Sequence, residues 1–107
     1  LKLLQALQLG CDGIITATCN VTASLSRQVY DDYLSGKKQL HNKKLCEVRG
    51  IFDQYNLISG LHTFYSKENE IYKNILPPLS LLNKKEEEDL INSLKAVNFT
   101  NNSSKAA

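Results

Sequence analysis

Residues 10–20 read Gly-Cys-Asp-Gly-Ile-Ile-Thr-Ala-Thr-Cys-Asn and contain the only strand candidate in the chain. The run at 14–18 is short, continuous and rich in β-branched residues rather than alternating. That pattern is typical of a strand covered on both faces, as in a parallel sheet. The sequence therefore predicts a tight turn, one buried strand and a polar segment that ends at Asn20.

A buried strand needs neighbours on both sides, because each unpaired buried backbone group costs roughly 1–3 kcal/mol. No other segment of the sequence can supply those neighbours. The chain also contains no Met and begins at Leu1, inside an apolar periodic segment, without the pattern of a secretory signal. We therefore expect the chain to be part of something larger, truncated at its N-terminus.

Composition is that of one ordinary globular domain. The chain has 107 residues and a formal charge of +2, with acidic and basic residues interspersed. No nucleic-acid or membrane-surface footprint stands out, and the apolar runs are far shorter than the roughly 20 residues that cross a bilayer. We expect neither nucleic acid nor membrane as a partner.

The cysteines do not form a metal-binding or disulfide pattern. Cys11, Cys19 and Cys46 are an odd number without ligand spacing, so we interpret them as reduced thiols of a cytoplasmic protein. We expect no metal and no cofactor. Four sites fit the glycosylation pattern, and we expect them to be unused: Asn20, Asn98, Asn101 and Asn102.

Helical spacing recurs on both sides of the strand candidate. Leucines over residues 1–7 predict the end of a helix, and Gly10 stands where a left-handed residue ends one. Apolar residues four apart predict a second helix over 21–34. Thr22 is its expected N-cap and Gly36 its expected stop.

Residues 37–55 predict one long amphipathic helix, basic at 37–44 and apolar on one face after that. We interpret the lysines as a solvated helix face rather than a nucleic-acid surface, because no aromatic platform accompanies them. Another short helical face follows over 58–65. Gly60 lies inside it, which predicts close packing or a helix boundary there.

The last third of the chain has a connector, a helix and a tail. Residues 66–80 contain Pro77-Pro78, which excludes regular helix, although their apolar side chains require burial. Asn83 and Glu86 have the spacing of a capping box, and a last apolar stripe follows them. Residues 98–107 are polar, and we expect them to fray.

The chain offers no complete catalytic set. His41 lies in a charged stretch, and His62 lies on an apolar face where a structural histidine is favoured over a ligand. A helix, a buried strand and a helix are the repeating unit of α/β proteins, whose ligands meet the carboxyl ends of strands. In a (β/α)8 barrel, residues 16–20 would face the site, where Ala17 would leave room for substrate.

Residues 10–21 resemble the last barrel strand of the dihydrodipicolinate synthase/N-acetylneuraminate lyase family, which carries the pattern G-x-D-G-x-I-S-x-x-x-N-hydrophobic. The resemblance continues in register. The helix up to Gly36, the apolar stripe over 45–55 and the connector Leu76-Pro77-Pro78-Leu79 match the elements that follow in that family. It covers nearly the whole chain except the polar tail.

The resemblance implies a class I aldolase fold: a (β/α)8 barrel with appended C-terminal helices, usually tetrameric. In that family a lysine on the sixth strand forms a Schiff base with pyruvate or another 2-keto acid, which then reacts with an aldehyde. The resemblance places that lysine upstream of Leu1. None of the lysines of this chain takes its role, so we expect no catalytic residue here and no activity from this chain alone.

Two residues carry the implied site. The backbone around Ile15 is expected beside the bound keto acid, with only its carbonyl claimed as functional. Ala17 is expected to border the pocket for the second substrate, and Leu9 to approach a subunit interface.

Two signals on substrate choice conflict. Ala-Thr-Cys-Asn at 17–20 replaces the Ser-Thr-Tyr-Asn of sialic acid lyases and favours 4-hydroxy-tetrahydrodipicolinate synthase, of lysine biosynthesis, or a 2-keto-3-deoxy sugar-acid aldolase. Ser-Gly-Leu-His-Thr at 59–63 resembles the lyase branch instead. The synthase is the favoured reading, with N-acetylneuraminate lyase or a sugar-acid aldolase as the alternative.

The expected organisation is α/β, mostly helical with one short strand. Residues 1–36 would end the barrel, 37–97 would form a helical extension and 98–107 a disordered tail. A reading of another class is a stand-alone helical interaction module without catalysis, in which 14–18 is only a buried turn.

Overall fold

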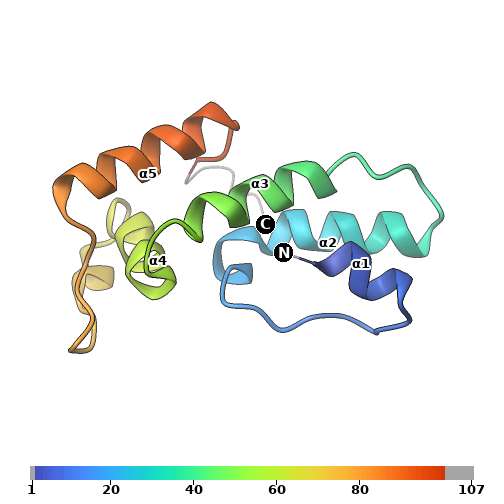
Figure 1. Ribbon diagram of the computed structural model, residues 1–107, viewed down its shortest axis with the longest axis horizontal. Coiled ribbons are helices and arrows are strands. Elements are labelled where there is room, and N and C mark those ends of the chain that lie inside the picture. The colour runs from blue at the N-terminus through green and yellow to red at the C-terminus, as the bar shows by residue number, and fades with distance from the viewer. Residues whose placement is uncertain (1, 101–107) are drawn as a thin grey trace.

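The computed structural model describes residues 2–100, and its regular elements are all helical within that range. Figure 1 shows them along an elongated molecule of 42 × 26 × 22 Å. In chain order they are α1 (Leu3–Gln8), α2 (Cys19–Leu34), α3 (Asn42–Phe52), α4 (Leu57–Ser66), the 3₁₀ helix η1 (Glu70–Lys73) and α5 (Lys84–Ala96).

Local chemistry sets the helix ends, as expected at three positions. Gly10 and Gly36 have φ of 95° and 69°, which only glycine adopts at little cost, and each ends its helix. At Gly10 its own amide donates to the Leu7 carbonyl, and the next amide donates to the Ala6 carbonyl. The capping box is present before α5, where the Asn83 side chain accepts from the Glu86 amide at 2.9 Å.

Two hydrophobic clusters share α3. The amino-terminal cluster is Leu3, Leu7, Val29 and Leu45. The carboxy-terminal cluster is Val21, Val48, Ile51, Phe52, Leu61, Phe64, Leu90, Leu94 and Phe99. Figure 1 shows α3 across the middle of the molecule, with α1 and α2 toward one end and α4 and α5 toward the other. One helix therefore joins the two halves.

Gly60 is explained by close packing. A Cβ at this position would lie 3.3 Å from Cδ1 of Phe52, whose ring is fully buried. The absence of a side chain lets α4 approach that ring.

The expected buried strand is absent from the part of the chain that the structure describes. Residues 11–16 have no regular secondary structure and run as an extended segment beneath α1 in Figure 1. Within residues 2–100 no strand pairs with them to complete a ladder, in line with the missing neighbours. Burial alternates instead: Ile14 packs on the amino-terminal cluster, and Ile15 is fully exposed. The expectation that both faces are covered is therefore wrong within residues 2–100.

Two helix predictions need correction. The helix expected over 37–55 is shorter, because the chain reverses direction after Gly36 and α3 begins only at Asn42. Gln39 stabilises this reversal, since its Nε2 donates a hydrogen bond to the Val29 carbonyl at 3.1 Å. Thr22 is not an N-cap. Its backbone is a kink inside α2, and its hydroxyl donates backward to the Thr18 carbonyl at 3.0 Å.

The connector and the chain end also differ from expectation. Ile71 and Leu76 are 63% and 83% exposed rather than buried. Asn98, at φ 58°, ends α5, and Phe99 then enters the carboxy-terminal cluster and stacks on Phe64 at 5.9 Å. Residues 98–100 are thus ordered by burial of one aromatic ring, while 101–107 of the expected tail lie outside the described residues.

Candidate substrate pocket

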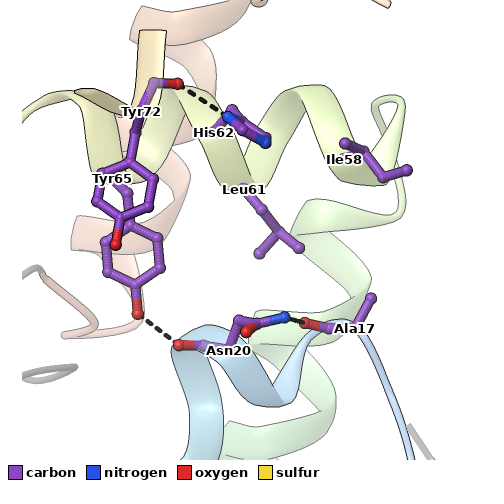
Figure 2. A pocket seen from close by; sticks show the side chains of 7 residues that line it. All are labelled: Ala17, Asn20, Ile58, Leu61, His62, Tyr65 and Tyr72. Carbon is purple, nitrogen blue, oxygen red and sulfur yellow. Dashed lines mark hydrogen bonds between the residues drawn. The ribbon is translucent and has the colours of Figure 1, made fainter. Parts of the chain in front are cut away.

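A pocket of about 500 Å³ lies where the end of the 10–20 stretch meets α4 and η1. Figure 2 shows the side chains that line it, which come from the turn at 17–20 and, about 40 positions later, from α4 and the adjoining η1. They are Ala17, Asn20, Ile58, Leu61, His62, Tyr65 and Tyr72.

Backbone hydrogen bonds form the turn on one side of the pocket. The amides of Cys19 and Asn20 donate to the carbonyls of Thr16 and Ala17, and the Asn20 side chain donates to the Ala17 carbonyl at 2.8 Å. Tyr65 of α4 donates its hydroxyl to the Asn20 carbonyl, a contact drawn in Figure 2. The turn and α4 are therefore held together at the pocket.

His62 joins α4 to η1 on the other side. Its Nδ1 lies 2.9 Å from the Tyr72 carbonyl, which can only accept, so Nδ1 carries the proton of this hydrogen bond. Nε2 is then the ring nitrogen that can reach a ligand. This bond is in line with the structural role expected for the histidine, which also lies on the pocket wall.

The walls are aromatic and apolar. The rings of Tyr65 and Tyr72 lie 5.1 Å apart at 30°, and the imidazole of His62 lies edge-on to Tyr72 at 6.4 Å. Ile58 and Leu61 complete the wall. Asn20 and His62 add polar groups to this wall, and a mainly apolar lining with a few polar groups is typical of pockets that bind small molecules.

A polar cluster centred on Arg49 holds the turn in place. Nη1 of Arg49, on α3, lies 3.1 Å from the Thr16 hydroxyl and 2.8 Å from the Thr18 hydroxyl, and the two hydroxyls are 3.1 Å apart. Nε of the same arginine donates to Asp53 at 2.8 Å. Sequence reasoning did not identify this cluster. Arg49 lies more than 30 positions from the two threonines, and the only signal was its opposite charge to Asp53, four residues further along the predicted helix.

The two predicted substrate-binding residues are both exposed and alternate with the more buried residues 14, 16 and 18. Ala17 lines the pocket, whereas the Ile15 side chain points to solvent. The structure thus brings Ala17 together with His62, and leaves Ile15 outside the pocket wall. The role of the Ile15 carbonyl stays a prediction.

Two further findings concern residues 2–100. They contain no group of three or more His, Cys, Asp or Glu side chains placed to hold a metal ion. None of their helices is both long enough and apolar enough to cross a membrane.

Comparison with protein families identifies a match over most of the chain. The model of the dihydrodipicolinate synthetase family matches residues 2–97, which include the 10–20 stretch, all the helices and every residue that lines the pocket. Searches of the curated proteins and of the solved structures gave no significant match.

Proposed function

The chain belongs to the dihydrodipicolinate synthetase family, and from that premise we propose that it is the carboxy-terminal part of a Schiff-base lyase. The full-length enzyme would condense or cleave pyruvate, or another 2-keto acid, with an aldehyde. The observation that carries the proposal is the position of Ala17. This residue of the family-like stretch opens onto a pocket whose other wall comes from α4 and η1.

The chain supplies binding surface rather than the reacting amine. A lysine upstream of Leu1 would add to the keto carbonyl and lose water to form the Schiff base. The Ile15 carbonyl would lie beside the bound keto acid, and Ala17 would border the second substrate. By itself the chain would be inactive.

The residues behind the two conflicting signals on substrate choice line the same pocket. Ala17 favours the synthase, and Leu61 and His62 belong to the stretch that resembles the lyase, yet all three line one pocket. We favour 4-hydroxy-tetrahydrodipicolinate synthase, with N-acetylneuraminate lyase or a 2-keto-3-deoxy sugar-acid aldolase as the alternative. We also propose a homotetramer for the full-length protein, in which Leu9, 79% exposed here, approaches a subunit interface.

Borohydride trapping tests the mechanism. The full-length protein is incubated with pyruvate and sodium borohydride, which reduces a Schiff base to a stable secondary amine, and its peptides are mapped by mass spectrometry. We expect one pyruvate-dependent adduct, on a lysine outside residues 1–107. The 107-residue chain treated in the same way is the control and should remain unmodified. An unmodified full-length protein, or an adduct on one of the lysines of this chain, would contradict the proposal.

A second candidate function is a helical interaction module without catalysis. The exposed apolar side chains of the connector, Ile71 and Leu76, favour it. This reading predicts that the chain alone is a monomer that unfolds cooperatively. A molten or aggregated chain would contradict it.

A further inference from the structure

Arg49 makes two hydrogen bonds to the pocket turn and one along its own helix. The two N–H groups of Nη1 are matched by two acceptors, the hydroxyls of Thr16 at 3.1 Å and Thr18 at 2.8 Å. Nε donates to Asp53 at 2.8 Å, one turn further along α3. Asp53 therefore fixes the orientation of the guanidinium plane, and the plane fixes both threonines.

The two threonines flank Ala17, the residue that opens onto the pocket. Thr18 is fully buried, and Thr16 is half-buried on the same inward face. Ala17 lies between them in the turn and is exposed on the pocket side, so the bonds that hold residues 16 and 18 to Arg49 also restrain residue 17. The carbonyls of 16–18 in turn accept the amides that begin α2.

These three hydrogen bonds require the planar, forked guanidinium group of an arginine. A lysine has a single nitrogen on a flexible stem and cannot hold a carboxylate and two hydroxyls in one plane. The other arginine of the described residues, Arg27, has the same pairing four residues along its helix, with Asp31 at 3.1 Å, and lies over the Tyr30 ring instead of bonding to the threonines of the turn. It therefore serves as a matched control.

We propose that Arg49 is a positioning residue that holds the Thr16–Thr18 turn in register, so that Ala17 presents the correct edge of the pocket to the second substrate. The inference rests on the proposed function for its substrate. The local restraint itself can be tested without any reaction.

The first experiment measures hydrogen–deuterium exchange in the full-length protein, on peptides that cover residues 16–22 and, for comparison, α5. We expect Arg49→Met to raise exchange at the turn by about tenfold, because a buried hydroxyl and its neighbour lose a charged donor. Arg49→Lys should give an intermediate increase, while Arg27→Met should leave the turn unchanged. In each variant α5 should exchange as in the wild type.

If Arg49→Met raises exchange equally in all peptides, the effect is one of general stability and the positioning role is contradicted. Unchanged exchange at the turn would contradict it as well. Should Arg49→Met not fold, Thr16→Val decides the question. It removes one acceptor from a half-buried site and should raise exchange at the turn alone.

The second experiment links the turn to the reaction through kinetics of the same proteins with pyruvate and an aldehyde. We expect Arg49→Lys to raise KM for the aldehyde about tenfold and kcat to change less than about twofold, with wild-type trapping of pyruvate by borohydride. If the wild type forms no adduct, the proposed function fails. If the adduct forms but Arg49→Lys and Arg27→Lys have wild-type KM values, the Arg49 inference fails and the proposed function stands.

Discussion

Tyr55 is the described residue whose protonation responds most clearly to its surroundings. It lies half-buried against the carboxy-terminal cluster, near the start of α5. Burial raises the pKa of its hydroxyl above the ordinary 10.0, and the negative charges of Asp89 and Glu86 raise it further. The neutral form is therefore favoured in the folded protein relative to the unfolded chain.

This shift predicts a loss of stability at high pH. Below the unfolded pKa, near 10, both states are neutral at this group and its stabilising effect is complete. As pH rises from there through the folded pKa, the unfolded state ionises first and stability falls. Urea unfolding between pH 8 and about pH 11 should therefore show a smaller alkaline loss for Tyr55→Phe than for the wild type. Tyr30→Phe, in the other cluster, is the control, and an equal loss in all three proteins would contradict the assignment.

At the scale of the element, the capping box before α5 predicts a defined cost. The side chain of Asn83 accepts from the Glu86 amide, and the Glu86 carboxylate accepts from the Asn83 amide at 3.1 Å. Asn83→Ala removes the first bond and leaves a helix N–H without its acceptor. We expect a loss of about 1 kcal/mol in the free energy of unfolding, measured with urea.

Asn92→Ala gives the matched comparison, because Asn92 is exposed inside the same helix. Its effect should stay within about 0.5 kcal/mol. Equal effects of the two substitutions would show that the cap contributes nothing.

Elements whose ends depend on neighbouring residues could be predicted from the sequence. Gly10, Gly36 and Asn83 act through bonds to residues at most a few positions away, and the structure places helix ends at each. The 14–18 segment could not be assigned correctly, since a strand exists only when another strand pairs with it. The local sequence pattern shows that such a segment tends to be extended, but it does not show which strand would pair with it.

The candidate site was predictable only where the family motif reaches it. Ala17 lies within the stretch that resembles the family and lines the pocket, and its place beside a second substrate stays a prediction. Arg49 and Tyr72 were missed, because their contributions depend on contacts across α3 and η1 that no local pattern encodes. Phe99 was missed for a similar reason: a single ring in a polar tail gives no periodic signal.

At the scale of the whole molecule, the uncovered edge at residues 11–16 has a consequence for behaviour in solution. Ile15 is fully exposed on an extended segment that has no strand beside it in the described part of the chain. Such an edge is a template for pairing with another chain. The 107-residue chain, expressed alone, should therefore self-associate through this segment.

Ile15→Lys should lower that association by about severalfold without changing helix content, because a charged edge residue opposes pairing. Light scattering after size-exclusion chromatography measures it. Leu34→Lys is the control. Leu34 is also exposed, at 62%, but it ends a helix whose backbone is already hydrogen-bonded, so its effect should be smaller. Equal effects would show that general surface hydrophobicity, rather than the unpaired edge, drives association.

The paired rings of the pocket wall give the protein a built-in optical reporter. The chain has no tryptophan and five tyrosines, so tyrosine dominates its near-ultraviolet circular dichroism. The rings of two of the five, Tyr65 and Tyr72, pack in a tilted pair at 5.1 Å and line the pocket. Such bands depend on fixed ring packing. A change in them on titration with a keto acid or an aldehyde would therefore report occupancy of this pocket without a label, a coupled enzyme or turnover.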